Sequence, residues 1–211
     1  MADGSGYAVR FDVDYPGEMD RMTTFFRLIW VIPIAVVLGL LANTGGFHYV
    51  DATGKAAEAT GGGITAGLFL ATVLMLVFRQ KYPRWWFDFA VELARFSSRV
   101  GVYAFLMTDK YPSTDETQSV HLEVDYPDAT QLHRWLPLVK WLLAIPHYIV
   151  LAVLGLVAVL ATIIAWFAIL FTGTYPRGLF DFVVGVGRWS ARVWAYAFLL
   201  VTDVYPPFSL R

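Results

Sequence analysis

Two stretches of this chain occur twice, and this similarity constrains the fold more than any other feature. Val9–Pro16 (VRFDVDYP) returns as Val120–Pro127 (VHLEVDYP). Lys81–Pro112 returns as Thr174–Pro206, with one extra residue near its end. Self-similarity over a period of roughly a hundred residues indicates two related halves instead of a solenoid of short units. The predicted organisation is an N-terminal tail (1–8), a first repeat (9–112), a linker (113–119) and a second repeat (120–211).

Composition places the chain in the membrane class. Hydrophobic residues make up 57% of its 211 residues and charged residues only 16%, with a mean hydropathy of +0.55. Soluble domains are nearer ~25% charged. The net charge of −1 argues against nucleic acid as a partner, and the absence of cysteine excludes disulfides and thiolate chemistry. The acidic N-terminal stretch does not resemble a cleavable signal peptide, so we expect internal segments to drive membrane insertion.

Three runs without charged residues are candidates for membrane helices: Leu28–Val50, Ala59–Phe78 and Trp141–Pro176. A helix needs roughly 20 residues to cross a bilayer core of ~30 Å, so each of the first two is about one crossing. The third would be about 54 Å long as a single helix. It is either a helical hairpin with a tight turn near Gly155 or one long tilted helix. We favour the hairpin, because the flanking motifs are too alike to lie on opposite sides of a membrane.

The polar stretch Asn43–Gly63 separates the two apolar runs of the first half and predicts a long exposed loop. Of the 16 Lys and Arg residues, only Lys55 lies in this loop. The positive-inside rule then places both termini in the cytoplasm and the loop on the far side of the membrane. Because the second half has no counterpart, this loop is our first candidate for a partner-binding surface.

Charged residues recur at helical spacing after each pair of apolar segments, which predicts an interfacial amphipathic helix in each half. Guanidinium groups on such a helix can bind lipid phosphates, and the alternative is that they pair with neighbouring acids and reach out to water. The lipid-headgroup candidates are Arg84, Arg95, Arg99, Arg177, Arg188 and Arg192. The candidates for structural ion pairs are Asp88, Glu92 and Asp181.

Small residues also recur four apart on these two segments, at Ala90, Ala94 and Ser98 and at Gly187, Ala191 and Ala195. In membranes such rows allow helices to approach closely. We predict that they form a contact between the halves or with a partner, in preference to a substrate groove.

The two copies of the shorter motif alternate apolar and polar residues, which predicts short strands that end at proline. The strands pair with each other or with a partner's strand, since an isolated strand is marginal in water. The predicted fold class is therefore an all-α membrane protein of two tandem repeats. Each repeat is expected to hold a short strand, a transmembrane helical hairpin and an interfacial amphipathic helix.

Candidate chemical groups are few. His147 lies in an apolar run, but the four histidines share no metal-ligand spacing, so a hydrogen-bonded structural role is favoured over a metal or haem ligand. Four aspartates beside Tyr-Pro motifs suit turns better than acid–base catalysis; these are Asp14, Asp109, Asp125 and Asp203. The chain has no glycine-rich phosphate loop and no hydrolase motif, so we predict no enzyme activity, cofactor or metal.

Several motifs of the second half resemble a known family. They are LAIPH (143–147), FAILFTG (167–173), YPRGLFDF (175–182) and TDVYPPFSL (202–210). They resemble a bacterial family of multi-pass membrane proteins catalogued only as a domain of unknown function, strongly over 120–210 and more loosely over 9–112. The resemblance implies a multi-pass protein of the bacterial cytoplasmic membrane and carries no catalytic residues.

Three functions remain open from the sequence. The first is a non-catalytic accessory or scaffold subunit that packs lipids and docks on a larger membrane complex or on further copies of itself. The second is a small transporter or channel with its pathway between the repeats. The third is a lipid-modifying or cofactor-binding membrane subunit. We favour the first, because aromatic and small residues are abundant while ionisable groups are almost absent from the apolar runs.

Overall fold

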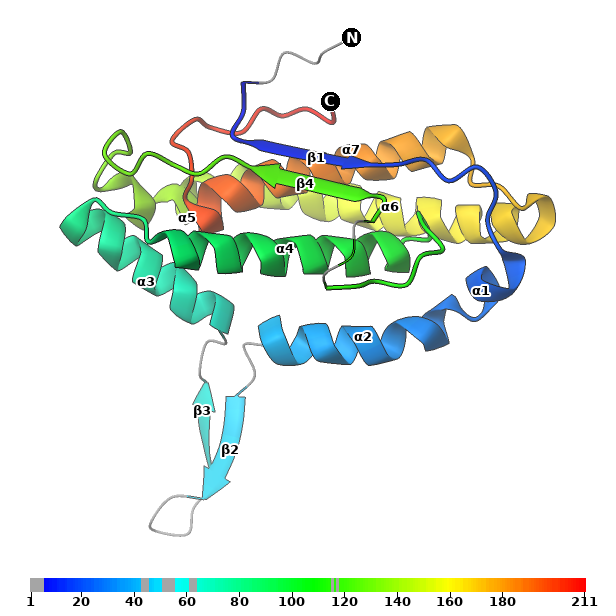
Figure 1. The fold of residues 1–211 in the computed structure, drawn as a ribbon, viewed down its shortest axis with the longest axis horizontal. Coiled ribbons are helices and arrows are strands. Elements are labelled where there is room, and N and C mark those ends of the chain that lie inside the picture. Colours follow the sequence, from blue (N-terminus) through cyan, green and yellow to red (C-terminus); the bar gives the residue numbers. More distant parts are fainter. Residues whose placement is uncertain (1–5, 43–45, 51–55, 61–63, 115, 117) are drawn as a thin grey trace.

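The structure is a computed structural model that describes residues 6–42, 46–50, 56–60, 64–114, 116 and 118–211. Helices make up most of it (Figure 1). The elements are β1 (Val9–Val13), α1 (Arg21–Phe25), α2 (Arg27–Ala42), β2 (Gly46–Val50), β3 (Ala56–Thr60), α3 (Ile64–Arg79), α4 (Arg84–Ala104), β4 (Val120–Val124), η1 (Leu136–Leu138), α5 (Lys140–Leu143), α6 (Ile145–Thr172), α7 (Arg177–Trp194) and the π-helical turn η2 (Ala195–Leu199).

A two-stranded antiparallel sheet of β1 and β4 covers one side of the molecule (Figure 1). Val9 lies opposite Val124, and Val13 lies opposite Val120. The first, third and fifth residues of β1 are buried while the residues between them are exposed, as the alternating sequence requires. The two segments expected to form strands thus pair with each other, although they are far apart in the chain.

Helices α4 and α7 lie directly beneath this sheet, with β4 on α4 and β1 on α7. Each helix begins after the proline of a Tyr-Pro pair, and both prolines adopt the extended conformation of an N-cap residue. The predicted interfacial helices are therefore internal elements, sandwiched between the sheet and other helices. Their charged faces point toward the strands and the segments beside them.

The extra residue of the second long motif is accommodated at the end of α7. There the chain passes through the π-helical turn η2, in which hydrogen bonds span one residue more than in an α-helix. Leu200 follows in the left-handed conformation at a φ of 61°, and Leu106 after α4 has a φ of 60°. Both helices are thus ended by a non-glycine residue in this conformation.

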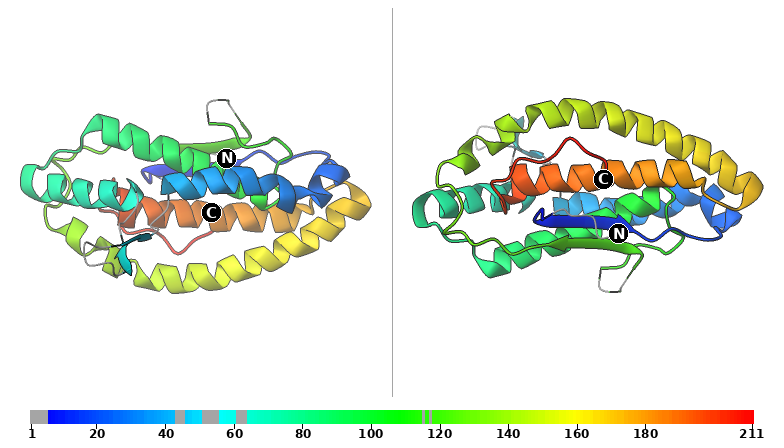
Figure 2. Two further views of the ribbon diagram at one scale, coloured as in Figure 1. Left: turned by 90° about the horizontal axis from the view of Figure 1, so that it is seen from below. Right: turned by 90° about the horizontal axis from the view of Figure 1, so that it is seen from above.

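Helices α2 and α3 lie on the side of the molecule opposite the sheet (Figures 1 and 2). Each has 16 residues, or about 24 Å at 1.5 Å per residue. Between them, β2 and β3 pair antiparallel, with Gly46 opposite Thr60, within what the sequence predicts to be a loop. The remaining parts of that predicted loop, including Lys55, lie outside the described residues.

The apolar run of the second half forms one uninterrupted helix, α6, with 28 residues. Gly155 is an ordinary helical residue in its middle, and no turn occurs there. The helix ends at Gly173, whose φ of 76° is the left-handed conformation typical of a helix C-terminus. Seen from above and below, α6 follows a curved path along one edge of the molecule (Figure 2).

The predicted fold class is wrong. The second half contains a single long helix where a transmembrane hairpin was expected, and the first half contains two short helices separated by strands. The halves therefore do not form two equivalent tandem units. Among the described residues, one helix, Ile145–Thr172, is long and apolar enough to cross a membrane. The predicted multi-pass topology is not supported, because α2 and α3 are apolar but too short to cross a membrane.

Candidate functional site

Arg27, the first residue of α2, is a buried cation with only 2% of its surface exposed. Its Nη1 donates to the carbonyl oxygen of Thr108 at 2.7 Å, and its Nη2 donates to Oδ1 of Asp109 at 2.5 Å. The guanidinium also lies over the ring of Tyr103, 4.1 Å from the centroid. Because a buried charge is costly unless it is paired, these contacts hold the segment after α4 against the start of α2.

Lys140, the first residue of α5, is buried in the same manner with 0% exposure. Its Nζ donates to the carbonyl oxygen of Thr202 at 2.8 Å and forms an ion pair with Oδ1 of Asp203 at 2.6 Å. The ammonium lies 5.4 Å from the centroid of the Tyr196 ring. Burial lowers the pKa of Lys140, and the Asp203 carboxylate opposes that shift. We call the Arg27 and Lys140 sets the two cation clamps.

The carboxylates of the clamps also bind backbone groups elsewhere in the chain. Oδ2 of Asp109 accepts a hydrogen bond from the N–H of Asp20 at 2.8 Å, just before α1. Oδ2 of Asp203 accepts from the N–H of His133 at 2.6 Å. Two aspartates that the sequence suggested as turn formers therefore connect segments that are 89 and 70 residues apart.

The other two aspartates beside Tyr-Pro motifs lie on the exposed surface near the sheet. Asp125 pairs with Arg10 at 2.9 Å. Asp14 lies 3.1 Å from Nε2 of His121. Exposed pairs of this kind contribute little to stability, because water screens the charges. Their exposure fits a surface role.

Two arginines of the predicted lipid-binding stripes attach the sheet to the helices beneath it. Arg95 on α4 donates through Nε to the carbonyl oxygen of Leu122 in β4 at 3.0 Å. Arg188 on α7 donates through Nε to the carbonyl oxygen of Phe11 in β1 at 3.1 Å and pairs with Asp12 at 3.1 Å. These donors satisfy outward-facing carbonyls at sheet edges, which would otherwise be free to pair with another strand.

Two further arginines bind chain segments that follow the helices. Arg99 donates to the carbonyl oxygen of Ser113 at 2.7 Å. Arg192, which is 3% exposed, donates to the carbonyl oxygens of Ser209 and Arg211. Arg192 therefore fastens the C-terminal segment onto α7.

Arg84 and Arg177, at the starts of α4 and α7, remain exposed. The Arg84 guanidinium lies over the ring of Tyr126 at 5.0 Å, and that of Arg177 lies over the ring of Tyr15 at 4.3 Å. Of the six arginines predicted to contact lipid headgroups, these two make no hydrogen bond to a backbone carbonyl among the described residues.

The acids predicted to form ion pairs differ in their surroundings. Glu92 lies 2.6 Å from Nη1 of Arg95, one turn along α4. Asp181 lies 3.4 Å from Nε of Arg177 on α7. Asp88 is exposed and has no ion-pair partner within the part of the chain that the structure describes.

His147 is buried at the N-terminal end of α6 among aromatic rings. Its Nδ1 accepts a hydrogen bond from Nε1–H of Trp189 on α7, at 3.1 Å. Its ring stacks on Phe208 of the C-terminal segment, with centroids 4.0 Å apart and planes inclined by 21°. The ring of Tyr205 also packs against the imidazole, with ring centroids 4.8 Å apart. The sequence did not single out Trp189 or Phe208 as neighbours of this histidine.

These contacts give His147 a structural environment. Since Nδ1 accepts from an indole N–H, the neutral ring carries its proton on Nε2. Among the described residues, no group of three or more His, Cys, Asp and Glu side chains is arranged to hold a metal ion. The ring thus joins α6, α7 and the C-terminal segment.

The outer surfaces of α2, α3 and α6 are apolar and exposed. On α6 the exposed side chains recur every three or four residues along one face: Ile149, Val153, Leu156, Leu160, Ile163 and Phe167. Helices α2 and α3 also expose large apolar side chains: Leu28, Ile32, Leu40, Leu70, Leu74 and Phe78. We call these side chains the apolar surface. Soluble monomers rarely expose contiguous apolar patches beyond a few hundred Å², so this surface indicates a lipid or protein environment.

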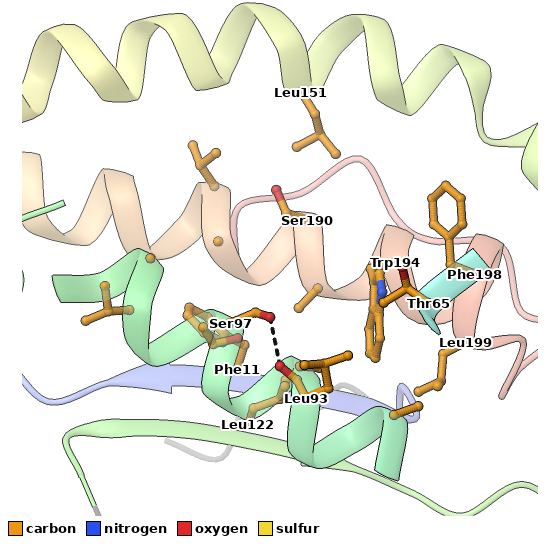
Figure 3. A pocket seen from close by; sticks show the side chains of 18 of the residues that line it. Phe11, Thr65, Leu93, Ser97, Leu122, Leu151, Ser190, Trp194, Phe198 and Leu199 are labelled. Carbon is orange, nitrogen blue, oxygen red and sulfur yellow. Dashed lines mark hydrogen bonds between the residues drawn. The ribbon is translucent and has the colours of Figure 1, made fainter. Parts of the chain in front are cut away.

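A cavity of about 840 Å³ lies between α3, α4, α6 and α7 (Figure 3). The small residues of the two predicted helix-packing rows line it, except Ala195. They are Ala90, Ala94, Ser98, Gly187 and Ala191. Those rows therefore border an open space instead of a tight helix contact. The sheet closes one side, where Phe11 and Leu122 reach the cavity.

The model of a family described as a domain of unknown function, DUF4389, matches residues 135–209. The matched segment includes α5, α6, α7, η2 and most of the C-terminal segment that covers His147. The predicted resemblance to a family of unknown function is confirmed over this segment. No curated protein and no solved structure matches the chain.

Proposed function

We propose that this chain is a non-catalytic membrane protein held in lipid by the apolar surface of α2, α3 and α6. The observation that carries the proposal is the exposure of large apolar side chains along one whole face of the 28-residue helix α6. Full exposure of a large apolar side chain to water costs about 1.5–3 kcal/mol relative to full burial, and these side chains, at 50–64% exposure, would each carry roughly half of that cost in water. A bilayer removes that cost without requiring a second protein.

The charged parts of the molecule suit the boundary between lipid and water. The sheet of β1 and β4 and the C-terminal segment lie on the side opposite α2 and α3 (Figure 1). Arg84 and Arg177 are the residues we propose for contact with lipid phosphates, because their guanidinium groups are exposed. The other four arginines of the predicted set hold the sheet and its neighbouring segments in place.

We expect a charge on the apolar surface to prevent membrane association. Val153 of α6 is 61% exposed, and the variant Val153→Asp places a carboxylate on that surface, about a third of the way along the helix. A charged residue costs about 2.5–3.5 kcal/mol at the centre of a membrane-embedded helix and less toward its ends, so we expect partitioning to fall at least roughly tenfold. Flotation of vesicles in a density gradient at neutral pH measures the bound fraction.

Val204 provides a matched control, since it is the same residue type, is 63% exposed and lies outside the three apolar helices. Val204→Asp should float as the unaltered protein does. If Val153→Asp floats equally well, the apolar surface is not the part that enters lipid. If the chain is also an accessory subunit, it should co-purify with a partner protein after extraction in a mild detergent. Purification as a lone monomer would argue against docking on a larger complex.

We further propose that the sheet side faces the bacterial cytoplasm, in agreement with the distribution of Lys and Arg. The chain contains no cysteine, so a single introduced cysteine is the only thiol in the protein that a maleimide can label. Glu123→Cys, on the exposed face of β4, should react with a membrane-impermeant maleimide in inverted vesicles and stay unlabelled in intact spheroplasts. Leu156→Cys on the apolar surface should stay unlabelled in both, and labelling of Glu123→Cys in spheroplasts would reverse the orientation.

A further inference from the structure

The cavity follows one face of α4 for almost the entire helix. Its lining residues on α4 recur every three or four positions from Trp86 to Val102. At 1.5 Å per residue this is about 24 Å. One acyl chain covers half of a ~30 Å hydrocarbon core, or about 15 Å. With a volume of about 840 Å³, the cavity is within the range of ligand sites and has the proportions of a channel.

Two of the hydroxyl groups that line this channel are hydrogen-bonded within the protein. Oγ of Ser97 donates to the carbonyl oxygen of Leu93 at 2.8 Å (Figure 3). The hydroxyl of Tyr82 donates to the carbonyl oxygen of Leu199 at 2.8 Å, and burial raises its pKa, so it stays protonated. Because the lining is mostly apolar and includes no charged side chain, the walls suit a hydrocarbon segment of a ligand.

Two of the walls are helices that also belong to the apolar surface. On α6, Leu151, Gly155 and Ala158 line the cavity, whereas Val153 and Leu156 lie on the outer face. On α3, likewise, one set of residues lines the cavity and another set belongs to the apolar surface. If these outer faces are immersed in lipid, as proposed above, the cavity lies directly behind helices that contact the bilayer.

We propose that this cavity binds one acyl chain of a membrane phospholipid. The inference rests on the proposed membrane location and adds to it a specific, saturable lipid site inside the fold. The cavity is long enough to hold a whole acyl chain of ~15 Å. Its mostly apolar walls, two of which also carry the apolar surface, select a hydrocarbon occupant. The headgroup of the bound phospholipid stays outside the cavity, since the channel offers no charged side chain to bind it.

Two glycines allow the cavity to be filled without disturbing the fold. Gly155 on α6 and Gly101 on α4 both line it, and a Cβ added at either position would meet no atom within 4 Å. Leucine is also a better helix former than glycine, so Gly155→Leu and Gly101→Leu should fold normally. Gly67 on α3 is exposed, has equal free space and does not line the cavity, which makes Gly67→Leu the matched control.

The test is native mass spectrometry of delipidated protein titrated with dioleoylphosphatidylglycerol in detergent micelles, with oleic acid titrated in parallel. We expect the unaltered protein and Gly67→Leu to bind one phospholipid with equal affinity. Gly155→Leu and Gly101→Leu should bind it at least tenfold more weakly, because the added side chain displaces several methylene groups of the ligand. Thermal unfolding of each variant shows that the fold is retained.

Equal phospholipid affinity in all four proteins overturns the assignment. Saturable binding of oleic acid without phospholipid binding also overturns it, because the ligand would then be a free fatty acid. A protein that floats with vesicles but binds no phospholipid in this assay refutes the cavity site and leaves the proposed membrane location intact. A protein that does not float refutes the location itself.

Discussion

Replacing Asp109 with alanine is expected to lower the free energy of unfolding by about 3–5 kcal/mol. Arg27 is 2% exposed, and Asp109 is the acid with which it pairs, at 2.5 Å. The substitution leaves the guanidinium buried with only a carbonyl and a ring as partners. It also removes the acceptor for the N–H of Asp20. Chemical unfolding in detergent micelles measures the change.

A double substitution separates the buried charge from the loss of packing. Arg27→Met in the Asp109→Ala background should recover most of the lost stability, because an apolar chain of similar length replaces an unpaired cation. Glu18→Ala serves as the control, since this acid is exposed and changes of that kind are usually within about 0.5 kcal/mol. If Asp109→Ala is no more destabilising than Glu18→Ala, the clamp does not hold the helices together.

Replacing Trp189 with alanine is expected to destabilise the fold by about 3–5 kcal/mol and to release the C-terminal segment. The indole is 5% exposed, donates to His147 and packs edge-on against Phe208, with ring centroids 5.5 Å apart. Removing it leaves a void beneath the segment and an unpartnered Nδ1 on the histidine. Limited proteolysis should then cut beyond Asp203, where the unaltered protein resists cleavage.

Trp189→Phe distinguishes the ring from its hydrogen bond. Phenylalanine retains most of the apolar contact but cannot donate to Nδ1 of His147, so the expected loss is about 1–3 kcal/mol. The C-terminal segment should stay protected in this variant. Equal proteolysis of Trp189→Phe and Trp189→Ala would show that the hydrogen bond, and not the ring, holds the segment.

The local elements were predictable where proline or charge interrupts the apolar sequence. Helices α4 and α7 begin after Pro83 and Pro176, because proline cannot continue a preceding helix but suits the position before a new one. Strands β1 and β4 follow from strict alternation over five residues. In both cases the signal lies in neighbouring residues, which sequence patterns describe well.

The long apolar run was not predictable in this way. Trp141–Pro176 contains no charged residue, and the glycine near its middle, Gly155, is compatible with both a turn and a helix interior. The hairpin was inferred from similarity to the first half, where α2 and α3 are separated by residues that the second half lacks. Without that insertion nothing interrupts hydrogen bonding along α6, so the continuous helix is favoured.

The cation clamps were also missed, although the sequence contained a signal for them. Arg27 and Lys140 occupy matching positions before an apolar run, and Asp109 and Asp203 occupy matching positions in Thr-Asp-x-Tyr-Pro motifs. A cation at the start of an apolar helix needs an acidic partner. The acids that pair with Arg27 and Lys140 lie 82 and 63 residues further along the chain. The cavity had no such signal, because rows of small residues are equally compatible with close packing.

The pairing of β1 with β4 determines when the fold can be completed during synthesis. Val9 lies opposite Val124, so β1 is made early but its only neighbour in the sheet follows after α2, α3 and α4. At a synthesis rate of about 5–20 residues per second, the first strand waits roughly 5–20 s for its partner. An unpaired strand can be captured by another nascent chain, and charges along it discourage that. Arg10 and Asp12, which alternate with its buried residues, protect the strand during the delay.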